Sequence, residues 1–276
     1  MPSISQFGTC ESDFPSSPAV KFDPKRGGPL AFCDAHLHLG EYADAEGSIT
    51  FARGANVVLY SASTDFPDSE RNLEFARRSP DLIKAFVGVH PSEAGKGLQE
   101  KEEIESLSRH ATGIGEVGLD PKYSAITEGS AELRIFRVQL ELAERLARPV
   151  QVHTRGAEQA CLDNLESFSP PSVLLHWFQG SEVAPRAADR GYYVSFGPAI
   201  LYSKKLAGIA RSYPGDLILT ESDAPVTYSP LGEAVSGPSL IPSVVFFLSQ
   251  LLGLDFAETA NMVSENSRRY LEGKKG

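Results

Sequence analysis

The stretch FCDAHLHLG, residues 32–40, ends an apolar run with two histidines one residue apart. Successive side chains of a β-strand point to opposite faces, so Asp34, His36 and His38 are expected to share one face of a strand. Buried polar side chains need partners, and a metal ion is a partner that suits imidazole. An exposed edge strand would show the same pattern, so the choice depends on the rest of the chain.

The composition is that of a globular protein large enough for one α/β barrel: 276 residues, 41% hydrophobic and 22% charged. A net charge of -10 argues against tight nonspecific binding to duplex DNA, although a bound metal could still attract phosphate. The three cysteines form no CxxC pattern and no apolar run has transmembrane length, so we expect a cytoplasmic protein with no membrane partner. Residues 1–29, rich in Pro, Ser and Gly, are expected to be a flexible N-terminal tail before a single domain at 30–276.

Short apolar runs alternate with helical patterns after residue 30. The apolar runs predict strands at 31–38, 56–61, 83–90, 113–117, 149–153, 173–176, 192–196 and 217–221. Apolar residues at helical spacing predict helices at 69–78, 99–109, 130–147, 157–168, 181–189, 204–213, 239–252 and 255–270. Eight such alternations favour a single-domain (β/α)8 TIM barrel of the α/β class. An open doubly wound sheet stays possible, although no glycine-rich fingerprint follows the first strand.

Ionisable side chains gather at the carboxyl ends of these expected strands. Five of the six histidines are found there with three acidic residues: His36, His38, His90, His153, His176, Glu116, Glu221 and Asp223. In a barrel all strands end at one face, so these side chains are expected to converge. A packed core would have to satisfy five imidazoles without an ion, whereas a metal site satisfies them directly.

This mixture of nitrogen and carboxylate ligands suits Zn, Mn, Fe or Ni better than Mg or Ca. The ligands exceed the needs of one tetrahedral site, which predicts two divalent metal ions with Glu116 as the bridging carboxylate. Glu116 as a salt-bridged barrel acid is the alternative. Two neighbouring metals would clamp the attacking and leaving oxygens of a hydrolytic displacement. The residues therefore predict a metal-dependent hydrolase, with the choice among Zn, Mn, Mg, Fe and Ni open.

Six short segments carry these strand ends in a fixed order, and a seventh closes the last helix: DAHLHL, VGVHP, GIGEVGLD, VHTRGA, LLHWFQGS, ESDAP and the closing ENSRRYL. Together they resemble the TatD-related metal-dependent deoxyribonucleases, a branch of the amidohydrolase-type barrels, from about residue 33 to residue 271. The resemblance implies hydrolysis of phosphodiester bonds, typically the trimming of nucleotides from DNA 3′ ends. It also implies two groups of metal ligands with one bridge: His36, His38 and Asp223; His153 and His176; and Glu116 between them.

The chain departs from the family pattern near the expected pocket. Ser92 stands where the family often has a second histidine after HP, which puts a usual substrate contact in doubt. Trp177 and Phe178 follow His176 where many relatives have a smaller pair, which predicts a narrower pocket mouth or a platform for base stacking. The HWFQG and VSFGPA segments look like a branch that includes subunits of phage-defence assemblies.

Five acidic residues are expected to have roles beyond simple ligation. Asp223 is expected to orient the nucleophilic water or to take its proton as general base, and with Glu116 it forms the expected catalytic pair. Glu221 shares the face of Asp223 and is expected behind the ligands. Asp34 and Asp120 are expected either to hydrogen-bond ligand imidazoles or to cap loops.

Two interpretations are possible for His90 and for Arg155, the basic side chains near the strand ends. His90 is expected to contact substrate phosphate, with a hydrogen-bonded core histidine as the alternative. Arg155, two residues past His153, is expected to fork onto a phosphate, with a salt bridge as the alternative. Lys204 and Lys205 open the helix after the seventh strand, and we expect no function for them.

The expected substrate is single-stranded or frayed DNA, because an intact duplex would press its phosphates against an acidic surface. The alternative is hydrolysis at a carbon centre, in a cyclic amide or an aminoacyl-tRNA ester. Amidohydrolases of that kind commonly bridge metals with a carboxylated lysine, whereas strand four here ends in Glu116. A subunit of a phage-defence assembly is a further alternative, against which the intact ligand set argues. Protein partners cannot be identified from these patterns.

Overall fold

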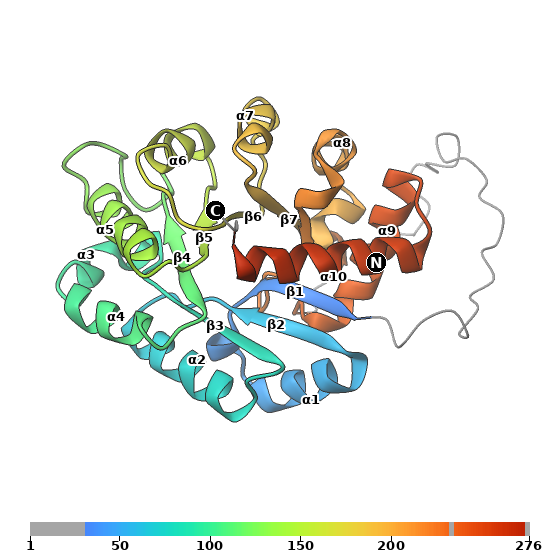
Figure 1. Ribbon diagram of the computed structural model, residues 1–276, viewed down its shortest axis with the longest axis horizontal. Coiled ribbons are helices and arrows are strands. Elements are labelled where there is room, and N and C mark those ends of the chain that lie inside the picture. Colours follow the sequence, from blue (N-terminus) through green and yellow to red (C-terminus); the bar gives the residue numbers. More distant parts are fainter. Residues whose placement is uncertain (1–30, 232–234, 274–276) are drawn as a thin grey trace, which may run out of the picture.

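The computed structural model describes residues 31–231 and 235–273, so the tail predicted at 1–29 lies outside the described residues. Eight parallel strands follow one another in sequence order around one sheet (Figure 1). The strands are β1 (Phe32–Leu37), β2 (Val57–Ser61), β3 (Ile83–Val87), β4 (Gly113–Gly118), β5 (Val150–His153), β6 (Val173–His176), β7 (Tyr193–Phe196) and β8 (Ile218–Thr220).

The sheet closes where the segment after β8 meets β1. The backbone N–H of Asp223 donates to the carbonyl of His36 at 3.0 Å, and the N–H of His38 donates to the carbonyl of Ala224 at 2.7 Å. These bonds join the last strand end to the first. The predicted (β/α)8 barrel is therefore confirmed, and the open doubly wound sheet is excluded.

Helices surround the barrel and connect its strands (Figure 1). They are α1 (Ala45–Ala55), α2 (Phe66–Arg78), α3 (Ala94–Gly97), α4 (Lys101–Ser108), α5 (Ala131–Arg145), α6 (Glu158–Leu165), α7 (Ala184–Asp189), α8 (Lys204–Ser212), α9 (Ile241–Leu252) and α10 (Phe256–Glu272). Every predicted helix is present, with modest shifts at its ends. Apolar spacing does not predict α1, because Gly47, Gly54 and several polar residues interrupt its apolar stripe. Asp44 caps this helix by accepting the N–H of Gly47 at 2.8 Å.

The last helix, α10, covers the amino-terminal end of the barrel. Tyr270 is fully buried, and its hydroxyl donates to the carbonyl of Val150, the first residue of β5, at 3.0 Å. Asn266 donates to the carbonyl of Ile218, the first residue of β8, at 2.8 Å. The ring of Tyr270 stacks on that of Tyr60 with centroids 6.3 Å apart. With one end filled in this way, the carboxyl end of the barrel is the face at which polar side chains can meet.

No single helix among the described residues combines the length and apolar composition needed to cross a membrane. Pro238–Leu252 and Phe256–Glu272 reach that length and composition only as a pair, and the pair is bent by 109°. In the structure α9 and α10 both pack against β1.

Candidate metal centre

Glu116, near the end of β4, lies at the centre of the converging side chains and is almost fully buried. Its Oε2 lies 3.4 Å from Nε2 of His36 and 3.2 Å from Nε2 of His38. Its Oε1 lies 2.6 Å from Nδ1 of His153 and 2.7 Å from Nε2 of His176. The two oxygens of one carboxylate therefore face two separate pairs of histidines.

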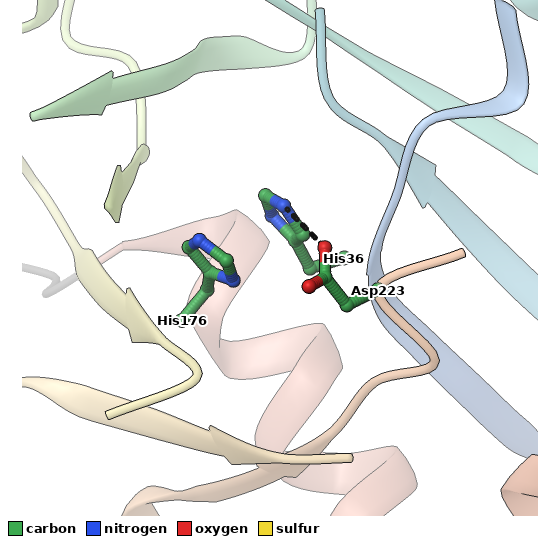
Figure 2. Close-up of side chains that lie close together, drawn as sticks. All are labelled: His36, His176 and Asp223. Carbon is green, nitrogen blue, oxygen red and sulfur yellow. Dashed lines mark ion pairs between the residues drawn. The ribbon is translucent and has the colours of Figure 1, made fainter. Parts of the chain in front are cut away.

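Asp223 joins the pair formed by His36 and His38. Its Oδ1 lies 3.7 Å from Nε2 of each ring. Figure 2 shows the carboxylate facing His36, with His176 on the other side of the group. The rings of His36 and His176 stack with centroids 3.8 Å apart. Asp223 has a φ of 47°, a left-handed conformation that Asp tolerates better than most residues and that is common at functional sites.

The donor set fits a divalent cation. Nε2 of His36 is buried and has no hydrogen-bond partner in the described part of the chain, which costs about 1–3 kcal/mol unless another ligand uses its lone pair. Four sets of ligand atoms among the described residues each lie within 4.8 Å of one another; one of them, His38, Glu41 and Asp68, lies beside the centre, and the other three belong to it. These three sets are His36, His38 and Glu116; His36, His176 and Asp223; and His90, Glu116 and His153. Buried imidazoles and carboxylates at such spacing are ligands for metals that accept nitrogen and oxygen.

The carboxylates of the centre differ in charge. Burial alone would raise the pKa of Glu116, but the histidines around it, His176 foremost, hold that pKa well below its usual value. Burial raises the pKa of Asp223 to about 7. Glu116 is thus held as an anion, whereas Asp223 gains a proton more easily until a bound cation lowers its pKa again.

Gln151, in β5, fixes the ring of His36. Its side-chain nitrogen donates to the carbonyl of Ala35 at 2.8 Å, so its Oε1 accepts from Nδ1 of His36, also at 2.8 Å. Nδ1 then carries the hydrogen, and Nε2 presents its lone pair to the cluster. Burial lowers the pKa of His36 to about 4, which keeps the ring neutral. Gln151 is missing from the predicted site, although it shares a strand face with His153, a signal that could have revealed it.

Gln151→Leu is expected to weaken metal binding by about 10- to 100-fold, because the ring of His36 loses its orienting partner while every ligand remains. A competition titration of Zn²⁺ against a chromophoric chelator measures this. Gln159→Leu, on the exposed face of α6, is the control and should bind metal normally. Equal metal affinity in the two variants would show that Gln151 does not orient the ligand.

Asp120 connects His153 to Arg155. Its Oδ2 lies 2.8 Å from Nε2 of His153 and accepts from Nε of Arg155 at 2.8 Å. Nδ1 of His153 is thereby turned toward Glu116, as when a carboxylate orients a metal-binding imidazole. Asp120 therefore has both of the roles considered for it, because its Oδ1 also accepts the backbone N–H of Lys122 at 2.8 Å and caps that loop. Arg155 forms the salt bridge, yet its side chain stays 51% exposed and lines the pocket.

Asp34 anchors the segment that carries Asp223. Its carboxylate accepts the backbone N–H of Ser222 at 2.7 Å and the Ser222 hydroxyl at 2.6 Å. Of the two roles expected for Asp34, these bonds fit the holding of a loop and not the orientation of an imidazole. The reason is geometric: Asp34 lies at the seam between β1 and β8, where its near donors belong to Ser222.

Glu221 lies behind His176, as strand parity predicts. Its Oε2 accepts the hydroxyl of Ser195 at 2.5 Å and lies 3.6 Å from Nδ1 of His176. Its Oε1 accepts the backbone N–H of Trp177 at 3.0 Å. Glu221 thus supports a ligand and the residue after it. Ser195 was not among the predicted residues, because a serine inside a strand carries no local signal.

His90 lies beyond the end of β3, because that strand ends at Val87 and not at residue 90 as predicted. Its Nε2 lies 3.8 Å from Oε1 of Glu116. Its Nδ1 accepts the backbone N–H of Ser92 at 3.2 Å, so Nε2 carries the hydrogen. Burial lowers the pKa of His90 to about 4. His90 is therefore a neutral donor at the pocket, and Ser92, a departure from the family pattern, sets its orientation.

The cluster forms the floor of a pocket of about 770 Å³. Tyr123, Arg155, Trp177 and Lys205 are among the residues that line it. Phe178 is fully buried in the core, so only Trp177 of the predicted bulky pair reaches the pocket. Lys205, for which no function was expected, is part of the lining.

Comparisons with known proteins agree with this geometry. A family model described as TatD related DNase matches residues 33–272. The chain is 30% identical over 246 residues to the uncharacterized metal-dependent hydrolase YabD of Bacillus subtilis, covering 85% of this chain and 96% of the relative. It is 29% identical over 237 residues to the 3'-5' ssDNA/RNA exonuclease TatD of Salmonella typhimurium, covering 80% of this chain and 90% of the relative.

The fold has solved counterparts. The crystal structure of YjjV, a TatD homolog from Escherichia coli K12, matches with a TM-score of 0.78 and 24% identity, covering 88% of this chain and 98% of that chain. At this identity the match shows the shared barrel. The family match extends from β1 to the end of α10 and includes every side chain of the metal centre. The chain belongs to the TatD-related DNase family of metal-dependent hydrolases, which act on ester bonds.

Proposed function

We propose that this protein is a two-metal deoxyribonuclease that trims the 3′ ends of single-stranded or frayed DNA. The observation that carries the proposal is Glu116, whose two oxygens face two separate histidine pairs. Divalent cations held there would polarise the phosphodiester and lower the pKa of a water molecule. The name of the Salmonella relative, a 3'-5' ssDNA/RNA exonuclease, supports the substrate class and the direction.

The side chains would divide the work by position. One cation would be held by His36, His38 and Asp223, the other by His153 and His176, and both by Glu116. Asp223 would take the proton from the attacking water, because its carboxylate lies beside the histidines that would hold this cation. His90 would donate from Nε2 to a phosphate oxygen, and Arg155 would offer its exposed guanidinium to the same group.

The charge of the chain supports a single-stranded substrate. At a net charge of -10, a long duplex would bring many phosphates toward an acidic surface, whereas a single-stranded end presents few. We also propose a cytoplasmic location, because the described cysteines, Cys33 and Cys161, are buried free thiols of the kind that persists in a reducing compartment.

The function is tested by incubating end-labelled single- and double-stranded DNA with the protein and Zn²⁺, Mn²⁺ or Mg²⁺. Stepwise shortening from the 3′ end, faster on the single strand, is the expected result. Asp223→Asn should lose it, whereas Asp189→Asn, on the exposed end of α7, should keep it. Turnover of cyclic amides or aminoacyl esters with inert DNA would overturn the proposal in favour of carbon-centre hydrolysis. No turnover of any substrate by metal-loaded protein would favour an assembly subunit.

Arg155→Ala is expected to weaken DNA binding by about tenfold or more while leaving the bound metal unchanged, because a charged hydrogen bond to phosphate is lost. Arg155→Lys should recover only part of the affinity, since lysine cannot make the bidentate contact. Separate KM, kcat and metal measurements check this, with Arg186→Ala, whose partners lie on the surface, as control. Loss of metal in Arg155→Ala would mean instead that Arg155 acts through Asp120 on His153.

A further inference from the structure

Trp177, the single tryptophan of the chain, forms part of the pocket wall directly after His176. Its backbone has a φ of 41°, a left-handed conformation that bulky residues rarely adopt. Glu221 holds it there by accepting its N–H at 3.0 Å. The backbone strain is thus retained at a position that places a large aromatic side chain in the wall of the pocket.

The ring of Trp177 is supported from behind. The ring of Tyr228 lies 5.6 Å away, tilted by 42°, and Tyr228 is itself buried, with its hydroxyl donating to the carbonyl of Ser222 at 3.1 Å. Nε1 of Trp177 is buried without a hydrogen-bond partner among the described residues, so the polar edge of the ring faces the protein. The part of the ring that reaches the pocket is carbon surface. A rigid aromatic surface of this kind is what a nucleobase stacks on.

Lys205, near the start of α8, lines the same pocket. It is exposed and makes no ion pair within 31–231 and 235–273, whereas Arg155 in the same lining is bound to Asp120. Its neighbour Lys204 is equally exposed but does not line the pocket. The unpaired ammonium of Lys205 can bind a phosphate group in the same pocket in which Trp177 offers a surface for base stacking.

We propose that Trp177 and Lys205 form a nucleotide subsite, in which a base stacks on the indole and a neighbouring phosphate pairs with the ammonium. The inference rests on the proposed nuclease function and goes beyond it. It names the residues by which the pocket would distinguish a nucleotide from a bare phosphodiester.

The first test is spectroscopic, because the emission of a single tryptophan reports on this subsite alone. The Asp223→Asn protein with Mg²⁺ is titrated with a short single-stranded oligonucleotide that it cannot cleave. Oligonucleotides with one abasic residue, moved stepwise from the 3′ end, are titrated in parallel. We expect quenching that follows binding measured by anisotropy, and loss of quenching when the abasic residue occupies one particular position.

The second test compares variants in the same background. Trp177→Ala should bind the intact oligonucleotide about thirtyfold more weakly, the middle of the range for one base–aromatic stack, and Trp177→Phe should retain most of the affinity. The oligonucleotide whose abasic residue abolishes quenching should bind with equal affinity to the Asp223→Asn protein with and without Trp177→Ala. Phe246→Ala removes an exposed aromatic side chain of α9 outside the pocket and is expected to change nothing.

The third test isolates Lys205 through salt. One lost phosphate contact on a single strand should reduce the slope of log K against log salt concentration by about 0.7. Lys205→Ala should show this reduction, and Lys204→Ala should not.

The outcomes separate this inference from the proposed function. The subsite is refuted if the oligonucleotide binds without a change in emission and with equal affinity to Trp177→Ala and Phe246→Ala. Trp177 would then only line the pocket, and the nuclease proposal would be unaffected. Hydrolysis of bis(p-nitrophenyl) phosphate without binding of any oligonucleotide would also refute the subsite. If wild-type protein loaded with metal neither binds nor cleaves DNA, both proposals are wrong.

Discussion

Replacing Glu116 with glutamine is expected to leave at most one tightly bound metal and to lower kcat by a factor on the order of a thousand, with little change in KM. The carboxylate is held as an anion, and both of its oxygens lie within 3.4 Å of histidine nitrogens. Glutamine has nearly the same size but lacks the charge that keeps two cations close together. Loss of one cation removes several kcal/mol of transition-state stabilisation, which corresponds to this factor.

Metal analysis by mass spectrometry and steady-state kinetics measure the two effects of Glu116→Gln. Glu132→Gln is the matched control, because Glu132 is as buried as Glu116 but accepts from the backbone N–H of Asp120 and the hydroxyl of Ser124 and does not lie between the histidine pairs. It should retain two metals. If Glu116→Gln also keeps two metals and turns over near the normal rate, another carboxylate is the bridge, and Asp223 is the next to test.

Removing the cations with a chelator is expected to abolish hydrolysis and to lower the melting temperature. A ligand that binds only the folded state at about 100 times its Kd adds roughly 2.7 kcal/mol of stability, or about 5–10 °C for a chain of this size. His36→Ala and His153→Ala should each lose activity, since they face different oxygens of Glu116 and so empty different sites.

The control for these histidines is His110→Ala. Of the six histidines, His110 is the one that does not follow a predicted strand. It is exposed just after α4, and its replacement should change neither activity nor metal content. Differential scanning calorimetry with and without Zn²⁺ or Mn²⁺ gives the stability. A purified protein that carries no metal, and whose melting temperature does not rise when either ion is added, would show that the cluster is not a metal site.

The barrel and the ligand types could be predicted because both follow local patterns. In a sequence, buried parallel strands are recognised as short runs rich in β-branched residues. The residue that ends each run lies at the carboxyl end of the barrel, where all the strands end. His36, His153 and His176 were found in this way. Their convergence on Glu116 follows from the fold class alone.

The orientation of each ligand could not be predicted in the same way, because it depends on residues far away in the chain. Gln151 binds His36 across 115 positions, and Asp120 binds His153 across 33. Strand parity places Gln151 on the face of His153, but no pattern in the sequence shows which imidazole Gln151 or Asp120 will bind. The predicted end of the third strand at His90 was wrong, because the apolar run in the sequence continues past Val87 whereas β3 ends there.

The helix that covers the amino-terminal end gives the barrel a closed floor. With Tyr270 from α10 packed there and the barrel interior filled by side chains, the described chain offers a DNA strand no passage through the protein. In the proposed nuclease a 3′ end would therefore enter only as far as the metal centre, and the severed nucleotide would leave by the opening through which the strand arrived. Strand and product would share one opening, so release of the product would compete with the advance of the strand. This arrangement would favour a distributive nuclease, which releases its substrate between cuts.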